Sequence, residues 1–176
     1  MAEIALRGWT AADVPALAAI MNNERMQGNL RDGIPFPYTE TDAVAFLQMI
    51  WDAVPGARYD FAITYDGEVV GNICAIPKDN VYRLTAEIGY CLAEAYWGRG
   101  IMVEAVRQVC AYMFARTEII RISAEVFAPN AASCRVLEKA GFQLEGILRQ
   151  NVLKNGQVLD AKMYAILKRE YTETGG

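Results

Sequence analysis

Two glycines at the start of a helical pattern give the strongest chemical signal in this sequence. Gly98 and Gly100 follow a strand-like segment and precede an apolar pattern of helical period that begins near Ile101. The first N–H groups of a helix lack partners within the helix, and the helix dipole adds partial positive charge there. Because glycine lets the main chain approach a ligand closely, this turn predicts a site for a pyrophosphate, with Arg99 adding a charged contact.

Neighbouring residues distinguish this turn from two common nucleotide-binding loops. A dinucleotide-binding loop has G-x-G-x-x-G after the first strand of a parallel sheet, whereas this turn follows an antiparallel meander and lacks the third glycine. A P-loop has Lys followed by Ser or Thr after its last glycine, and Ile101 and Met102 stand there instead. An ordinary strand-to-helix turn that binds nothing is the remaining alternative.

Histidine is absent from the 176 residues, which restricts the chemistry that the chain can do. Ser-His and Cys-His nucleophilic mechanisms are excluded, so any proton transfer must use a carboxylate, a tyrosine or water. Cys74, Cys91, Cys110 and Cys134 are widely spaced and form no C-x-x-C pair. We therefore predict neither a metal site nor a disulfide framework, and interpret the cysteines as buried thiols in a reducing compartment.

Length and composition predict one domain over residues 1–176 and a cytoplasmic protein. Hydrophobic residues make up 53% of the chain, enough for one continuous core, and no linker divides it. No segment approaches the roughly 20 apolar residues of a membrane-spanning helix, and residues 1–8 lack the apolar region of a signal peptide. A formal net charge of -4 with scattered lysines and arginines argues against a nucleic-acid partner.

Periodicity and turn residues predict the elements that must position this chemistry. Strands are expected at residues 4–7, 59–65, 68–76, 83–93, 119–127, 142–150 and 158–167. Helices are expected at residues 11–21, from Thr39 or Thr41 to residue 51, from residue 101 onward, and at residues 131–140. Asp66-Gly67 and Asn155-Gly156 predict tight hairpin turns. This order predicts an α/β fold, a mixed sheet with helices on both faces.

Seven short segments carry a further signal. They are LRGW at residues 6–9, LRDGIP at 30–35, PYT at 37–39, EIGY at 87–90, YWGRG at 96–100, NAAS at 130–133 and LEKAGF at 137–142. Their types and spacing resemble the GNAT superfamily of N-acetyltransferases, and within it the RimJ/RimL-like branch that acetylates protein N-termini. The resemblance covers nearly the whole chain, and it implies the acyl-CoA N-acyltransferase fold, a mostly antiparallel sheet, and acetyl-coenzyme A as co-substrate.

The resemblance implies where the coenzyme binds. In that family the glycine turn holds the pyrophosphate, and the strand before it splays from its parallel neighbour so that the pantetheine arm lies in the gap. The implied coenzyme-binding residues are Ile88, Gly89, Cys91, Leu92, Trp97, Gly98, Arg99, Gly100, Ile101, Met102, Val103, Asn130 and Ser133. Asn130 would contact the pantetheine and Ser133 would lie near the sulfur, although both also suit the cap and first turn of a helix.

Two residues of the glycine turn depart from the family's pattern. The motif usually starts with Gln or Arg and ends with Gly or Ala, and Trp97 and Met102 stand at those places. Trp97 is common in this branch. Met102 is bulkier than usual beside the phosphates, so its side chain either lowers coenzyme affinity or points into the core, as the helical stripe indicates.

The candidate catalytic residues are two glutamates, a tyrosine and a serine. An amine attacks a thioester only as the neutral base, so some group must accept its proton, and Glu87 and Glu125 are the candidates. Alternation along a strand allows either one to be a solvated surface carboxylate instead. Some members of the resembled branch carry a glutamate in the stretch equivalent to residues 149–152, where this chain has none. Tyr90 and Ser133 are the candidate proton donors to the departing thiolate.

The acceptor is the least determined part of the site. We expect the loop at residues 30–38 and the turn at residues 155–156 to frame the opposite mouth of the cleft. The candidate substrate-binding residues are Arg31, Asp32, Tyr38 and Asp160, although surface turns also carry such residues for solubility. The resemblance favours a protein or peptide N-terminal amine, and a small amine such as an aminoglycoside, polyamine or amino acid is the alternative.

Two further hypotheses stay open at this point. One is a non-catalytic protein that binds acetyl-coenzyme A without turning it over. Release of free thiol in the presence of amines would separate that protein from an enzyme. The other is self-association through exposed edge strands into a homodimer, for which the sequence reveals no interface.

Overall fold

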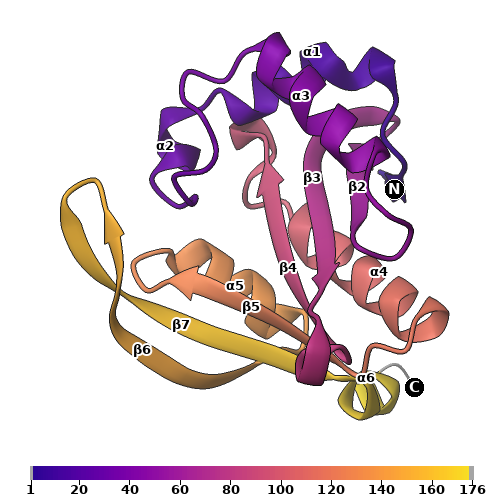
Figure 1. Ribbon diagram of the computed structural model, residues 1–176, viewed down its shortest axis with the longest axis vertical. Coiled ribbons are helices and arrows are strands. Elements are labelled where there is room, and N and C mark those ends of the chain that lie inside the picture. The colour runs from indigo at the N-terminus through magenta and orange to yellow at the C-terminus, as the bar shows by residue number, and fades with distance from the viewer. Residues whose placement is uncertain (1, 175–176) are drawn as a thin grey trace.

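Seven strands form one continuous sheet in the computed structural model, which describes residues 2–174. The strands are β1 (Ile4–Arg7), β2 (Tyr59–Tyr65), β3 (Glu68–Pro77), β4 (Thr85–Leu92), β5 (Arg121–Phe127), β6 (Gln143–Lys154) and β7 (Gln157–Leu167). Their spatial order is β1-β2-β3-β4-β5-β7-β6, and every neighbouring pair is antiparallel except β4 with β5 (Figure 1). The predicted mixed sheet is confirmed, while residues 1 and 175–176 of the predicted domain lie outside the described residues.

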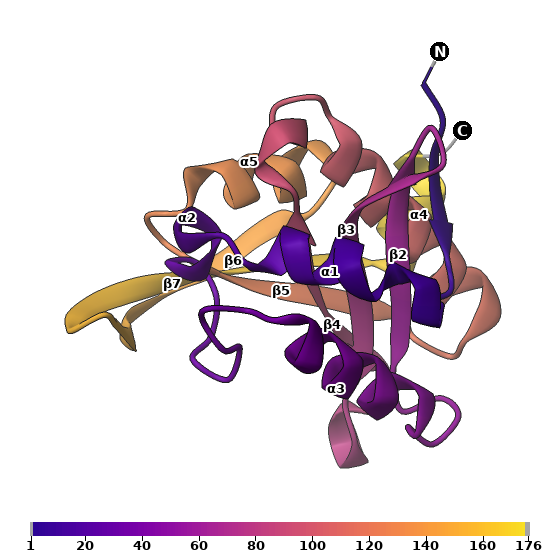
Figure 2. The same ribbon diagram turned by 90° about the horizontal axis from the view of Figure 1, so that it is seen from above.

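Helices cover both faces of this sheet, as Figure 1 and, from above, Figure 2 show. They are α1 (Val14–Met21), α2 (Glu24–Gln27), α3 (Glu40–Trp51), α4 (Ile101–Arg116), α5 (Ala131–Lys139) and α6 (Lys168–Thr174), with short 3-10 turns at Ala11–Asp13, Asn80–Tyr82 and Glu94–Tyr96. One core lies between the sheet and α4 and α5, and a second lies between the sheet and α1 and α3. The molecule therefore has one layer of helices on each side of the strands.

The turns and caps lie where the sequence predicts them. Asp66-Gly67 and Asn155-Gly156 turn the β2–β3 and β6–β7 hairpins, and all four residues have positive φ. Thr39, rather than Thr41, caps α3, because its hydroxyl accepts a hydrogen bond from the N–H of Asp42 at 3.3 Å. These local signals fix the ends of the elements independently of the packing.

Three features were not predicted. α2 has only four residues, too few for helical period to show, and it is held by the Asn23 side chain, which accepts from the N–H of Met26 at 2.9 Å. α6 is polar and has no apolar stripe. β6 continues to Lys154 beyond the predicted end at residue 150, because a bulge interrupts its alternation.

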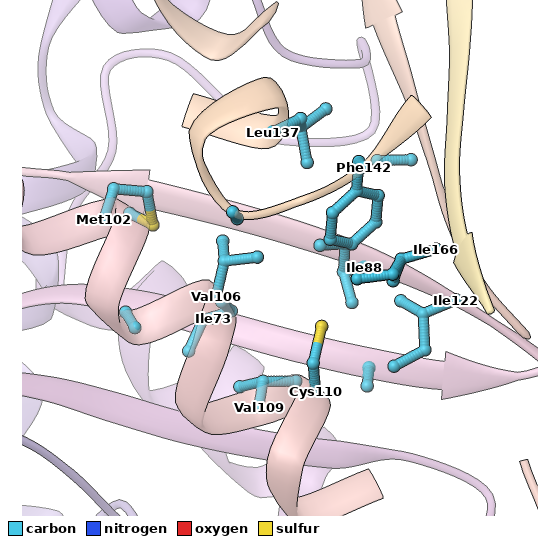
Figure 3. Packing of buried hydrophobic residues seen from close by; sticks show 14 of the residues in the cluster. Ile73, Ile88, Met102, Val106, Val109, Cys110, Ile122, Leu137, Phe142 and Ile166 are labelled. Carbon is cyan, nitrogen blue, oxygen red and sulfur yellow. The ribbon is translucent and has the colours of Figure 1, made fainter. Parts of the chain in front are cut away.

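The apolar stripe predicted on α4 packs against the sheet. Met102, Val106, Val109 and Met113 are all buried, and Figure 3 shows the first three in one cluster with Ile73 of β3. Burying an apolar side chain of this size contributes on the order of 1.5–3 kcal/mol, so the stripe fixes α4 firmly on the sheet. The start of α4 is thereby held at a fixed place beside the end of β4.

β4 and β5 separate soon after they start. Their parallel pairing ends at its third matched position, where Glu87 lies opposite Ser123. Beyond that position β4 stays paired with β3 as far as Leu92, and β5 stays paired with β7 along its whole length. The two strands therefore diverge, and the sheet opens as a wedge between them (Figure 1).

The cysteines are free in the structure. Burial raises the pKa of Cys91 and of Cys110 to about 12, so both stay protonated thiols at neutral pH. Within residues 2–174 no group of three or more Cys, Asp and Glu side chains gathers as metal ligands would. In the same part of the chain, no helix has the length and apolar character needed to cross a bilayer.

Candidate functional site

A cavity of about 1000 Å³ occupies the wedge between β4 and β5. It brings together most of the residues singled out in the sequence, from the coenzyme, catalytic and acceptor sets. Those in its lining are Arg31, Tyr38, Glu87, Ile88, Gly89, Tyr90, Cys91, Leu92, Trp97, Gly98, Gly100, Ile101, Met102, Val103, Glu125, Asn130 and Ser133. Arg99, Asp32 and Asp160 do not line it.

The glycine turn leaves room for a ligand at the N-terminus of α4. Gly98 and Gly100 have φ values of 76° and 78°, and a Cβ atom at either position would meet nothing within 4 Å. The indole of Trp97 fixes the turn by donating to the carbonyl of Leu92 at 2.7 Å. α4 has 16 residues, and its first three, Ile101, Met102 and Val103, line the cavity. These properties suit a pyrophosphate, and the residues present therefore fit coenzyme A.

Arg99 is turned away from the open space of the turn. Its guanidinium donates to the carbonyl of Ala95 at 2.9 Å and lies over the ring of Tyr96, 5.0 Å from the centroid. In this arrangement Arg99 packs against the short 3-10 turn before the glycines.

Met102 directs its side chain into the core. It is 6% exposed and packs with Val106 in the cluster beneath α4, as Figure 3 shows. The side chain therefore does not crowd the open turn at Gly100. Of the two alternatives for this departure from the family pattern, the structure places the methionine in the core.

The two faces of β4 serve different sides of the cavity. Ile88, Tyr90 and Leu92 belong to or pack against the core beneath α4 and α5. Cys91 belongs to the core beneath α1 and α3, and by the alternation of a strand Gly89 lies on that same face. We call the face toward α4 and α5 the coenzyme side and the face toward α1 and α3 the acceptor side.

Tyr90 and Ser133 form a hydrogen-bonded pair on the coenzyme side. The phenol and hydroxyl oxygens lie 2.6 Å apart. Burial raises the pKa of Tyr90 to about 12, so the phenol is protonated at neutral pH. Asn130 caps α5 by accepting from the N–H of Ser133 at 3.2 Å, so the helix-cap alternative for Asn130 holds alongside any coenzyme contact.

Glu87 and Glu125 both lie on the acceptor side of the cavity. Ile122 and Val126 belong to the core beneath α4, so the alternate residue Glu125 points to the opposite face. Glu87 forms an ion pair with Arg31, with 2.5 Å between Nη2 and Oε1. The carboxylate of Glu125 accepts instead from the side-chain amide of Asn151, at 3.0 Å.

The remaining acceptor candidates have structural partners. Tyr38 is buried, its N–H donates to the Asn22 side chain at 3.1 Å, and burial raises its pKa to about 12. Asp32 pairs with the ammonium of Lys154 at 2.7 Å, which ties the loop after α2 to the β6–β7 hairpin. Asp160 accepts from the N–H of Gln150 at 2.8 Å, outside the main cavity.

Sequence reasoning missed several residues of the acceptor side. Lys154 is buried although it stands beside a hairpin turn, where a lysine is expected in solvent. Asn151 gives no local signal, because its partner is 26 residues away in the chain. The ion pair of Arg58 and Asp60 could have been found, since Arg58 directly precedes β2 and residues two apart in extended chain share a face.

Comparison with known proteins relates the chain to one family. Residues 3–143 match the family described as acetyltransferase (GNAT) domain. The uncharacterized N-acetyltransferase p20 of Bacillus licheniformis is 34% identical over 139 residues, which are 77% of this chain and 78% of that protein. The uncharacterized N-acetyltransferase YoaA of Bacillus subtilis (strain 168) is 31% identical over 169 residues, 94% of each chain.

Solved structures have the same architecture. RimL, a ribosomal L7/L12 alpha-N-protein acetyltransferase in complex with coenzyme A, matches with a TM-score of 0.84 at 26% identity over 93% of both chains. Spermidine N-acetyltransferase from Vibrio cholerae, in complex with CoA and spermine, matches with a TM-score of 0.81 over 96% of this chain and 98% of that one. At 20% identity, the second likeness shows the fold alone.

Proposed function

The chain belongs to the GNAT acetyltransferase family, and from this premise we propose that it acetylates the N-terminal α-amine of a protein or peptide. Its activity as an acetyl-coenzyme A-dependent N-acetyltransferase follows from the family match and from relatives of that name. The kind of acceptor is inferred from the charges of the acceptor side. A polyamine and a peptide N-terminus differ in how many positive charges they bring into the cavity.

The acceptor side holds few carboxylates that are available to a cation. Glu87 is paired with Arg31, and Asp60 is buried in an ion pair with Arg58. Asp42 also lines the cavity, but it is held in the capping box at the start of α3, where the helix dipole compensates it. In the described part of the chain, Glu125 is therefore the one cavity-lining carboxylate with neither a cation nor a helix terminus as partner.

One uncompensated carboxylate in the cavity favours an acceptor with one positive charge. A polyamine has two or more ammonium groups and needs several uncompensated carboxylates, whereas a peptide N-terminus brings one ammonium followed by neutral amides. The rest of the acceptor side is largely apolar. Phe46, Met49, Ile34 and Ile76 line it and offer contacts to an uncharged chain. The likeness to RimL, whose described activity is on a protein α-amine, supports the same acceptor class.

The rest of the cavity supplies the parts that an acetyl transfer needs. The N–H groups at the start of α4 would hold the pyrophosphate, and the unpaired edge of β4 beyond Glu87 would offer backbone groups to the rest of the coenzyme. The acceptor amine reaches the thioester from the opposite side of the wedge. Ser133, hydrogen-bonded to Tyr90, donates a proton to the thiolate as it leaves.

An acceptor panel tests this proposal. The purified protein is mixed with acetyl-coenzyme A and with short peptides, spermidine, an aminoglycoside or free amino acids, and the release of thiol is followed. We expect peptides with a free N-terminus to react, and the same peptides with an acetylated N-terminus to be inert. Faster reaction with spermidine or a free amino acid would contradict the peptide acceptor. Binding of acetyl-coenzyme A without thiol release from any amine would identify a non-catalytic binding protein.

A further inference from the structure

A bulge in β6 brings a side chain onto Glu125. β6 pairs with β7 at Leu148 opposite Ala161 and again at Val152 opposite Leu159, so residues 149–151 face Asp160 alone. Three residues against one is more than a simple bulge, and it bends the strand at this point.

Asp160 holds the bulge in place. Its carboxylate accepts the N–H of Gln150 at 2.8 Å, and its carbonyl accepts the N–H of Ala128 just after β5. Gln150 has a φ of 54°, a left-handed conformation that a residue with a side chain adopts at a cost. The hydrogen bond from Asp160 therefore maintains a strained conformation at the residue before Asn151.

The consequence of the bulge is the position of Asn151. Its side-chain amide donates to Oε1 of Glu125 at 3.0 Å, although the two residues lie on strands that do not pair. β7 runs between β5 and β6, so the amide reaches across a whole strand to meet the carboxylate. A regular β6 would place residue 151 in register with β7 and leave Glu125 without this donor.

Glu125 stands at the point where the two strands of the wedge part. It lies two residues beyond Ser123, the last position of β5 that pairs with β4, which is about 7 Å further along the strand. On β4 the residue two beyond Glu87 is Gly89, which has no side chain to fill the gap. The Glu125 side chain therefore lines the cavity on the acceptor side, near the unpaired part of β4 where the thioester is expected.

Glu87 is placed differently. Its Oε1 accepts from Arg31, so an ammonium group that approached this carboxylate would meet the positive charge of a guanidinium. Asn151 is a neutral amide, and it orients Glu125 through one oxygen while leaving the other oxygen of the carboxylate to a substrate. The two candidate bases thus differ in what an incoming amine would encounter.

We propose that Glu125 is the general base of the transfer, and that Asn151 and Asp160 are positioning residues that fix the orientation of its carboxylate on the acceptor side. This inference rests on the proposed N-acetyltransferase function. The neutral amine attacks the carbonyl carbon of the thioester, which forms the C–N bond and a tetrahedral adduct with a positive nitrogen and a negative oxygen. Glu125 accepts a proton from that nitrogen and later passes it to water.

The adduct then collapses to products. The carbonyl re-forms, the C–S bond breaks, and the electron pair leaves on sulfur. Ser133 protonates the thiolate and is reprotonated through Tyr90 from solvent. The products are the N-acetylated amine and free coenzyme A.

Matched glutamine variants test the base. We expect Glu125→Gln to lower kcat by about 100-fold or more, as is typical when a general base is removed, while the affinity for acetyl-coenzyme A stays unchanged by calorimetry. Glu87→Gln should lower kcat by only a few fold. The reverse order would overturn the proposal, and so would full activity in both variants. Absence of turnover by the wild-type protein with every amine would instead be a failure of the acetyltransferase function.

The pH profile tests the positioning role of Asn151. In Asn151→Asp a second carboxylate would lie within hydrogen-bonding distance of Glu125, and like charges raise the pKa of the pair. We expect the acidic limb of kcat/KM to move to higher pH, measured with a weakly basic amine whose own ionisation does not mask the limb. An exposed residue on β7 provides the control, and Gln157→Asp should leave the limb in place. An acidic limb that stays in place in Asn151→Asp would contradict the positioning role of Asn151.

A rescue experiment tests whether Asp160 holds the bulge of β6 in place. Asp160→Ala should lower kcat about 10-fold without changing the affinity for acetyl-coenzyme A. The bulge loosens, and the Asn151 amide no longer donates to Glu125 in a fixed geometry. Adding Gln150→Gly should recover part of the loss, since glycine adopts the left-handed conformation at no steric cost. Loss of kcat without any rescue, in a variant that melts at the wild-type temperature, would contradict the positioning role of the bulge.

Discussion

The coenzyme side and the acceptor side of the cavity are built in different ways. Most of the coenzyme side comes from one continuous segment, in which β4, the glycine turn and the start of α4 follow each other from residue 85 to residue 103, and the start of α5 completes it. It presents backbone groups to its ligand. The acceptor side is assembled from side chains that meet across the chain, such as Arg31 with Glu87, 56 residues apart, and Asp32 with Lys154, 122 residues apart.

The two sides of the cavity therefore respond differently to substitutions. A site made of backbone depends on where glycines allow a close approach, and the bulky Met102 leaves that space open because its side chain is buried in the core. A site made of paired side chains depends on each partner. The acceptor preference is therefore free to change by substitution of a few charged residues while coenzyme binding stays intact.

The largest expected effect belongs to the glycine turn. Gly100→Trp should weaken acetyl-coenzyme A binding by about 100-fold or more in calorimetry, because the indole would occupy the open space at the start of α4. Gly67→Trp is the matched control, since Gly67 also has positive φ and open surroundings but lies in the β2–β3 hairpin. Equal loss in both variants would show that strain, rather than occupation of the turn, is responsible.

A smaller effect is expected from the proton donor on the coenzyme side. Ser133→Ala should lower kcat by 10-fold or more, and Tyr90→Phe by less, with the affinity for acetyl-coenzyme A changed little in either. Because burial raises the pKa of Tyr90 to about 12, the phenol stays protonated up to that pH. The wild-type rate should therefore show no falling limb between about pH 8 and pH 10, the range in which an ordinary phenol begins to ionise. A falling limb that disappears in Tyr90→Phe would contradict this assignment.

The sequence predicted most of the fold and the position of the glycine turn before α4. Period-two and helical patterns predicted all seven strands, and the caps and turns at Thr39, Asp66-Gly67 and Asn155-Gly156 lie where expected. The glycine turn could be predicted because its conformation needs positive φ, which is visible in the sequence as glycine. The same signal located the strand that leads to it and the helix that follows.

The acceptor side could not be predicted to the same degree. Arg31, Glu87 and Glu125 could each be singled out as chemically capable, but their pairing depends on how far β4 and β5 diverge and on how a loop crosses the wedge. Asn151 offered no signal at all, because the bulge that aims it is set by Asp160 on the neighbouring strand. Contacts between side chains distant in sequence require the packed structure.

The smallest expected effect is on stability, and it compares the two partners of the ion pair between Asp32 and Lys154. The Lys154 side chain is 9% exposed, whereas Asp32 is 78% exposed. Asp32→Ala leaves a buried ammonium without its carboxylate and should lower the free energy of unfolding by about 1–2 kcal/mol. Lys154→Met replaces the charge with an apolar side chain of similar length and should change it by less than about 1 kcal/mol.

Urea unfolding of the two variants measures this asymmetry, and calorimetry on the same samples relates it to the two sides of the cavity. Both variants should bind acetyl-coenzyme A with wild-type affinity, because the pair ties the loop after α2 to the β6–β7 hairpin and does not touch the glycine turn. Equal destabilisation in both variants would mean that the pair acts as a surface ion pair. A loss of coenzyme affinity in Asp32→Ala would mean that the acceptor side and the coenzyme side are coupled. The two sides would then not vary independently.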